Sequence, residues 1–203
     1  MASTCCNNLD SFFIYPNAIN CIYGKPATGK TTLCLLAASA EKGRVIFIDT
    51  ENSFSVERIK QINNTLPNNI FLINVKNFKE QCKAVEGLLN LKKQAALIII
   101  DSFTAYYRKE LQEKKDVNSR LSRQLSILSE LSREGIPVIL TSQVYSTLDN
   151  RTEPVGSNML KNWSNCIIRL EKEPRIFVLE KHPDKRTLSL PFDIVNKGIE
   201  FNA

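Results

Sequence analysis

The segment 24–31 reads GKPATGKT, and it constrains the fold of this chain more than any other part of the sequence. It matches the pattern GxxxxGK[ST] in full. Glycines in such a loop let backbone N–H groups turn inward around a phosphate, and a helix that begins there presents its positive N-terminal end to the same anion. An apolar run at 19–23 precedes the loop, and an almost wholly apolar stretch at 33–40 follows it. The sequence therefore predicts a strand, a phosphate-binding loop and a buried helix, in that order.

The residues of this loop predict a site for ATP and Mg²⁺. The ammonium group of Lys30 is placed to reach the β- and γ-phosphates, and the Thr31 hydroxyl is placed to ligate the metal. The alternative is a glycine turn that binds nothing, which the flanking strand and helix disfavour. The residues that we expect to contact the nucleotide are Gly24, Lys25, Pro26, Ala27, Thr28, Gly29, Lys30, Thr31 and Thr32.

Two carboxylates follow apolar strands downstream of the loop. Asp101 ends the run AALIIID, so a buried strand delivers its carboxylate to the sheet rim, where Mg²⁺ beside phosphates needs an oxygen ligand, directly or through water. A turn or helix-cap aspartate is the alternative interpretation. Another strand ends in Asp49, and Glu51 follows two residues later. In an ATPase, such a carboxylate is suited to orienting or deprotonating the attacking water.

The order of elements predicts an α/β fold with a mostly parallel central sheet flanked by helices. We expect strands at 19–23, 44–50, 70–75, 95–101 and 137–141, and helices at 30–40, around 84–89 and around 121–131. A polar loop at 145–158 follows, and then a C-terminal antiparallel hairpin formed by 166–170 and 175–179. In such a sheet, ligands bind at the carboxyl ends of the parallel strands.

Composition narrows the class of protein. The 203 residues, 43% hydrophobic and 24% charged, fit one globular domain. The formal net charge of +6 favours acidic partners such as nucleic acid, although basic residues also serve solubility. The six cysteines form no CxxC pair and there is one histidine, which argues against zinc-ribbon and histidine-rich metal sites. The sequence has no secretory signal and no apolar run long enough to cross a membrane, so we expect an intracellular protein.

Three further segments carry a family resemblance: VIFIDTENSFSVERI at 45–59, DSFTAYYR at 101–108 and TSQV at 141–144. Together with the phosphate loop they resemble the RecA recombinases, and more closely the archaeal RadA and eukaryotic strand-exchange proteins, with Ser142 replacing an asparagine. The whole chain is similar to the short archaeal paralogue group RadB. The resemblance implies a single RecA-like P-loop NTPase domain over 1–203, with no room before Gly24 for the N-terminal helical DNA-binding domain of the long recombinases.

The resemblance also implies roles for individual residues. Glu51 corresponds to the glutamate that positions the hydrolytic water, Gln143 to the glutamine that senses the γ-phosphate, and Arg58 to an arginine that packs against adenine. Without the resemblance, each residue also has an ordinary interpretation: Glu51 as a surface glutamate, Gln143 as a strand-end amide and Arg58 as a helix-surface arginine. Lys181, at the end of a strand, resembles the cation that such ATPases reach into the phosphates of a neighbouring subunit.

In the family two loops carry DNA, and they correspond here to segments within 108–120 and 145–159. Basic side chains there are suited to neutralising phosphates, and the alternative is a solvated helix face of mixed charge. The candidates are Arg108, Lys109, Lys114, Lys115, Arg120 and Arg151.

The sequence lacks the Phe-x-x-Ala hook of filament-forming recombinases, because no phenylalanine is followed by alanine three positions later. We therefore expect an accessory protein, or mediator, of homologous recombination and DNA repair. It would help a RadA-type recombinase to load on single-stranded DNA. ATP would act as a switch and would be hydrolysed slowly. The sequence allows either a monomer or a homo-oligomer. The alternatives are an autonomous strand-exchange recombinase and a KaiC-like signalling ATPase that acts on protein.

Overall fold

The computed structural model describes residues 2–3, 10, 13–64, 66–91, 94–111, 115–146 and 152–202. The strands of this part are β1 (Ile19–Gly24), β2 (Val45–Asp49), β3 (Ile70–Asn74), β4 (Leu97–Asp101), β5 (Val138–Ser142), β6 (Val144–Ser146), β7 (Thr152–Pro154), β8 (Cys166–Leu170), β9 (Ile176–Lys181), β10 (Leu188–Val195) and β11 (Gly198–Phe201). Its helices are α2 (Lys30–Ala40), α3 (Val56–Asn63), α4 (Phe78–Gly87), α5 (Ala105–Glu110), α6 (Val117–Arg133), α7 (Ser157–Trp163) and the 3₁₀ helix η1 (Leu88–Leu91).

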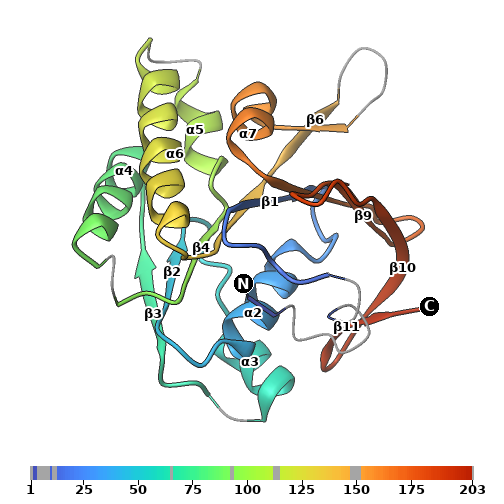
Figure 1. The fold of residues 1–203 in the computed structure, drawn as a ribbon. Helices are drawn as coiled ribbons and strands as arrows, with labels where there is room; N and C mark the ends of the chain where they lie inside the picture. Colours follow the sequence, from blue (N-terminus) through green and yellow to red (C-terminus); the bar gives the residue numbers. More distant parts are fainter. Residues whose placement is uncertain are drawn as a thin grey trace.

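Nine strands form one sheet in the order β11-β10-β9-β8-β1-β5-β4-β2-β3, and β6 and β7 form a separate hairpin (Figure 1). The pairings from β3 to β8 are parallel, whereas β9, β10 and β11 continue the sheet antiparallel. Strands β1, β2, β4 and β5 are buried along their whole length, as expected for central parallel strands covered on both faces. Their carboxyl ends bring Gly24, Asp49, Asp101 and Ser142 to one edge of the sheet.

Helices cover both faces of the parallel strands. Residues of α2 belong to one core cluster, together with side chains from β1, β2, β4 and the C-terminal strands. Residues of α4, α5, α6 and α7 belong to the other cluster, on the opposite face. Leu121, Leu125, Leu128 and Leu131 of α6 are fully buried, and each such leucine contributes about 1.5–3 kcal/mol to stability. None of the helices in the described ranges is both long and apolar enough to span a bilayer.

The C-terminal strands fold back over α2 (Figure 1), and this packing depends on a glycine. Gly198 begins β11 with φ +126, a conformation that side-chain-bearing residues rarely adopt. A Cβ atom at this position would lie 2.7 Å from Leu36 Cδ2 in α2. The β10–β11 turn thus sits directly against the helix that follows the phosphate loop.

The structure confirms the predicted α/β class, the parallel sheet and the C-terminal hairpin, and it extends the hairpin by β10 and β11. The helix predicted around 84–89 ends at Gly87, and its continuation is η1. The prediction of a loop over 145–158 was wrong for the described residues of that segment. They include β6, β7 and the start of α7, because Val144–Ser146 pairs antiparallel with Thr152–Pro154 and Leu160 of α7 is buried.

Candidate nucleotide-binding site

The loop between β1 and α2 has the shape that anion binding by backbone amides requires. Gly29 is the N-cap of α2 with φ 103, in the left-handed region, and no side chain caps the helix there. The first amides of an α-helix have no partner within the helix, so the N-terminal end of α2 remains available to an anion. The conformation of Gly29 turns the chain so that this end faces the concave side of the loop.

Lys30 occupies the concavity of the loop. Its Nζ donates hydrogen bonds to the carbonyl oxygens of Gly24 and Lys25, both at 2.9 Å. Burial lowers the pKa of Lys30, although the nearby carboxylates of Asp101 and Glu51 act in the opposite direction. A phosphate at this point would supply the counter-charge that favours the ammonium form.

Three hydroxyl groups donate hydrogen bonds to the buried carboxylate of Asp101. Its Oδ2 accepts hydrogen bonds from Thr31 Oγ1 at 2.7 Å and Ser53 Oγ at 3.1 Å, and its Oδ1 accepts one from Thr141 Oγ1. The carboxylate of Asp101 and the hydroxyl of Thr31 are hard oxygen donors, which fit Mg²⁺. Among the described residues no group of three or more His, Cys, Asp or Glu side chains is arranged to hold a metal. The pairing of Asp101 with Thr31 suits Mg²⁺ shared with substrate phosphates, because Mg²⁺ is usually bound through one or two carboxylates and retains several waters.

Glu51 and Gln143 come from different strand ends and meet at the same edge. Gln143 Nε2 donates to Glu51 Oε1 at 2.8 Å, and Arg108 Nη1 donates to Gln143 Oε1 at 3.4 Å. Partial burial raises the pKa of Glu51, and the negative charge of Asp101 adds to this effect, although Glu51 stays in contact with solvent. A cavity of about 450 Å³ joins these residues to the phosphate loop, and its lining includes Gly24, Pro26, Lys30, Thr31, Glu51, Ser53, Asp101, Arg108, Gln143 and Val144.

Asp49 holds the loop that carries Glu51. Its Oδ1 accepts hydrogen bonds from the backbone N–H groups of Glu51 and Ser53, both at 3.1 Å, and its Oδ2 accepts one from Phe54 at 2.9 Å. The sequence marks Asp49 only as the end of a strand. A short turn rich in Ser and Asn directly after a strand-end aspartate is the local signal for this role.

The guanidinium group of Arg58 is hydrogen-bonded to backbone carbonyl groups. Its guanidinium donates to Val195 O at 2.7 Å, Asn196 O at 2.9 Å and Gly198 O at 3.4 Å. Through these bonds Arg58 anchors the β10–β11 turn to α3. The predicted packing of Arg58 against adenine stays a prediction, and the contacts in the structure give the side chain a second role.

The basic residues predicted to contact DNA fall into separate groups. Arg108 and Lys109 lie exposed in the last turn of α5, and Lys115 is exposed just before α6. Arg120 instead pairs with Glu110 at 3.3 Å, and its guanidinium carbon lies 4.8 Å from the ring centroid of Phe78, so its contacts are internal to the fold. Lys114 and Arg151 lie outside the described residues.

Lys181 ends β9 beside Ile167, towards the opposite end of the sheet from the phosphate loop. Its Nζ donates to the carbonyl oxygens of Ser164 at 2.7 Å and Lys161 at 3.0 Å, at the end of α7. The structure therefore does not bring Lys181 to the phosphate loop of its own subunit. Its predicted action in a neighbouring subunit stays a prediction.

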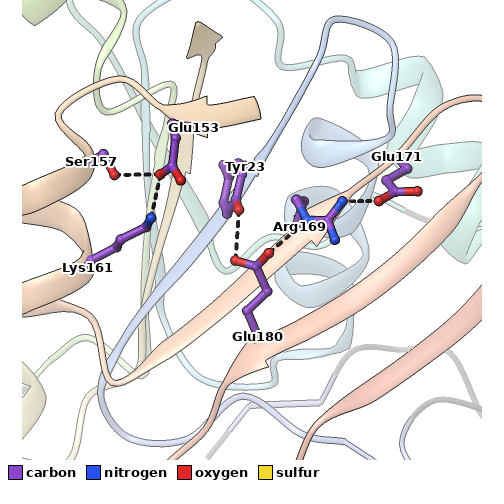
Figure 2. Close-up of polar contacts among 7 residues, drawn as sticks. All are labelled: Tyr23, Glu153, Ser157, Lys161, Arg169, Glu171 and Glu180. Atoms are coloured by element: carbon purple, nitrogen blue, oxygen red, sulfur yellow. Dashed lines mark hydrogen bonds and ion pairs between the residues drawn. The ribbon is translucent and has the colours of Figure 1, made fainter. Parts of the chain in front are cut away.

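A polar network that sequence reasoning missed lies beside the phosphate-loop strand (Figure 2). Tyr23 donates to Glu180 Oε2 at 2.8 Å, Arg169 Nε donates to Glu180 Oε1 at 2.7 Å, and Arg169 also pairs with Glu171. Burial and the hydrogen bond to Glu180 raise the pKa of Tyr23. The partners are up to 157 residues apart, so no local sequence signal indicates them.

Comparisons with known proteins show the family and the fold of the chain. A family model described as Rad51 matches residues 1–201. The DNA repair and recombination protein RadB of Methanocaldococcus jannaschii is 39% identical, and the match covers 88% of this chain and 91% of that protein. RadB of Thermococcus onnurineus is 34% identical, and the match covers 98% of this chain and 97% of that protein. The crystal structure of the RadB recombinase matches with a TM-score of 0.83 and 33% identity over 100% of both chains.

Proposed function

The chain belongs to the Rad51 family and is a homologue of DNA repair and recombination protein RadB, and we propose that it is an ATP-controlled, DNA-binding accessory protein of homologous recombination. In this proposal one RecA-like domain helps a main recombinase of the RadA type to load on single-stranded DNA. ATP acts mainly as a switch. The observation that carries the proposal is the hydrogen-bonded series from Glu51 through Gln143 to Arg108.

Nucleotide binding, which membership of the family implies, is assigned to the phosphate loop. Lys30 neutralises the β- and γ-phosphates, and the amides at the start of α2 bind their oxygens. Thr31 and Asp101 hold Mg²⁺, directly or through water, and the 2.7 Å hydrogen bond between them supports this pairing. When bound, Mg²⁺ neutralises charge on the phosphate oxygens.

The switch lies in the side-chain amide of Gln143. A γ-phosphate that enters the cavity shared by Lys30, Glu51 and Gln143 offers the amide a new acceptor and repels the Glu51 carboxylate. If Gln143 donates to the phosphate, it rotates away from Glu51, and its contact with Arg108 changes with it. Because Arg108 lies in the last turn of α5, the presence of the terminal phosphate is passed to the segment that holds the exposed basic residues.

Single-stranded DNA is the proposed ligand of that segment. Arg108, Lys109 and Lys115 are exposed, and the chain has a formal net charge of +6. Contacts of this kind neutralise backbone phosphates and give binding that depends on salt rather than on base sequence.

Hydrolysis of ATP to ADP and phosphate is proposed to be slow in an isolated subunit. Glu51 orients the attacking water, but the cation proposed to complete the site, Lys181, would have to come from a neighbouring subunit. In its own subunit Lys181 is bound to the carbonyl groups at the end of α7. Turnover should therefore rise with self-association.

The test measures the affinity for labelled single-stranded DNA by fluorescence anisotropy, without nucleotide, with ADP and with ATP plus Mg²⁺. Each series is run at about 50 mM and about 200 mM salt, a range over which phosphate contacts weaken steeply. We expect ATP, but not ADP, to change the affinity, and the higher salt to weaken binding in every series. Equal affinities with and without ATP, or no binding to DNA, would refute the proposal.

A strand-invasion assay separates an accessory protein from an autonomous recombinase. The protein alone should yield no joint molecules. Added to a RadA-type recombinase on single-stranded DNA, it should increase the yield, and Lys30→Ala should remove the increase. Joint molecules formed by this protein alone would instead assign strand exchange to it.

A further inference from the structure

Strand β3 forms one edge of the nine-stranded sheet, and no strand among the described residues pairs with its outer side (Figure 1). Its sequence is IFLIN, and it pairs with β2 in one continuous register from Ile70 to Asn74. Edge strands of soluble proteins are usually protected by charged residues, by proline or by a bulge. Strand β3 has none of these protections, so its outer side is open to pairing with another strand.

Two large apolar side chains in the middle of β3 are exposed. Phe71 has 46% of its surface accessible to solvent, and Leu72 has 41%. Successive residues of a strand point to opposite faces of the sheet. Ile73 packs on the core cluster that includes α4 and α6, which places Phe71 on the same face. Ile70 packs on the cluster that includes α2, which places Leu72 on the opposite face. The edge therefore presents an apolar side chain on each face.

The hydrogen bonds to β2 determine which backbone groups of β3 point outward. The N–H group of Val45 donates to Asn69 O at 2.9 Å, and the N–H group of Val75 donates to Asp49 O at 3.1 Å. Odd-numbered residues of this segment therefore face β2 with both their N–H and C=O groups, and even-numbered residues face away from it. The outward backbone groups belong to Ile70, Leu72 and Asn74.

These outward groups match a second copy of the same strand. If two β3 strands lie antiparallel with a two-fold axis at Leu72, Leu72 of one copy faces Leu72 of the other, and Ile70 faces Asn74. All of these are outward residues, so each facing pair can exchange N–H···O=C hydrogen bonds in both directions. Phe71 then faces Ile73 of the second copy, and such aromatic and β-branched pairs stabilise neighbouring strands.

Charge and size are also compatible with this contact. The residues of β3 are uncharged, and Lys76 beyond its end would face Asn68 of the second copy rather than another cation. One pair of short strands buries less surface than the roughly 1,200–2,000 Å² of a stable interface, so the association should be weak and reversible.

We propose that β3 is a self-association surface, through which two copies of the chain form an antiparallel two-fold dimer with one sheet running across both. The contact is closed, because each copy offers the same strand to the other. The carboxyl ends of β3 and of the parallel strands beside it point in opposite directions in the two copies, so the two phosphate loops stay apart. The association needs neither nucleotide nor DNA and goes beyond the proposed function.

Sedimentation velocity on the full chain without nucleotide, over about 1 to 500 μM, measures the association. We expect a reversible shift from a species of 23.0 kDa to one of twice that mass, with a dissociation constant on the order of 10–100 μM. A single species of 23.0 kDa throughout this range would overturn the proposal.

Opposite charges introduced at Leu72 test the two-fold axis. Leu72→Lys and Leu72→Glu each place like charges opposite one another at the centre of the contact, so each variant alone should dimerise at least about tenfold more weakly. An equal mixture of the two should regain dimerisation, because the lysine of one variant then faces the glutamate of the other. If both variants dimerise like the unchanged protein, or if the mixture associates as weakly as either variant alone, the pairing is overturned.

Ile14→Lys is the matched control, because Ile14 is 38% exposed and directly follows Phe13, which packs on Phe177 of β9 and not on β3. This variant should dimerise as the unchanged protein does, and its monomerisation would overturn the assignment to β3. Urea unfolding and ATP binding should be the same for all the variants, because the substituted side chains are exposed and lie outside the phosphate loop. If the unchanged protein dimerises but binds no ATP, the proposed function fails alone; if it binds ATP but stays monomeric, this inference fails alone.

Discussion

The side-chain amide of Gln143 donates to Glu51 Oε1 at 2.8 Å, while the oxygen of the same amide accepts a hydrogen bond from Arg108 at 3.4 Å. One side chain thus connects the carboxylate assigned to the hydrolytic water with the end of α5. A leucine at this position keeps the approximate shape but cannot make either bond.

Gln143→Leu should therefore separate nucleotide binding from the response to it. We expect the dissociation constant for ATP to change by less than about threefold. The phosphate loop is intact, and Gln143 only exchanges its hydrogen bond to Glu51 for one to the γ-phosphate, so its net contribution to ATP binding is smaller than that of one hydrogen bond. The difference in DNA affinity with and without ATP should disappear. Calorimetry and anisotropy measure the two quantities, and Gln94→Leu, at an exposed amide bonded to Arg44, serves as the control. A variant that retains the full ATP effect on DNA binding would contradict the switch.

The pH dependence of hydrolysis should report the environment of Glu51. The ionised form is the one that orients water, and partial burial together with Asp101 raises the pKa of this carboxyl. Activity should therefore be lost on acidification at a higher pH than an ordinary glutamate would give. In the nucleotide-free protein the hydrogen bond from Gln143 lowers this pKa, so Gln143→Leu should move the acid limb of kcat/KM, which reports that state, to still higher pH. Rates at ATP concentrations well below KM measure the acid limb of the unchanged protein and of the variant, and an unshifted or more acidic limb in the variant would be inconsistent with this environment.

Asp49→Ala should impair hydrolysis without touching the nucleotide. Three backbone N–H groups lose their acceptor, which should lower the free energy of unfolding by about 2 kcal/mol or more and release the loop that carries Glu51. Glu51→Gln should reduce kcat about a hundredfold or more, and Asp49→Ala should approach that loss. Because both changes act on one carboxylate, the double variant should be little slower than Glu51→Gln alone. Additive losses would mean that Asp49 acts independently.

Gly198→Ala should destabilise the protein. The new methyl group would meet Leu36 Cδ2 at 2.7 Å in a backbone conformation, φ +126, that alanine rarely adopts, so we expect a loss of about 2 kcal/mol or more. Gly87→Ala is the matched control, because its Cβ would meet no atom within 4 Å and it lies at the end of α4. That change should leave stability equal or raise it by up to about 1 kcal/mol. Urea unfolding measures both, and comparable stabilities for the two variants would argue against tight packing of the β10–β11 turn.

The parts of the fold that the sequence predicts are those with strong local patterns. The helix at Lys30–Ala40 was predicted with its observed bounds, because a glycine N-cap and a buried apolar run define it. Short elements such as α7 and the β6–β7 hairpin carry too few residues to show a period. They owe their structure to pairing and packing that form only in the folded chain.

The same division holds for the candidate site. The positions of Lys30, Asp101 and Glu51 follow from strand ends that meet at one edge of a parallel sheet. The contact of Arg175 with Ala27 joins residues 148 positions apart through a sheet that turns antiparallel and returns to its first helix. The spacing of residues along the chain contains no information on how far such a sheet bends.

The observed contacts of Lys181 and its predicted action in a neighbouring subunit cannot occur at the same time. Its ammonium group closes the last turn of α7, which directly follows the β6–β7 hairpin. If Lys181 binds the phosphates of a second subunit, α7 loses the hydrogen-bond donor at its end. The β6–β7 hairpin, which directly precedes α7, is then less firmly held. An encounter between protomers would then be registered by the donor subunit at the end of its own α7, and assembly would carry a conformational signal as well as a chemical one.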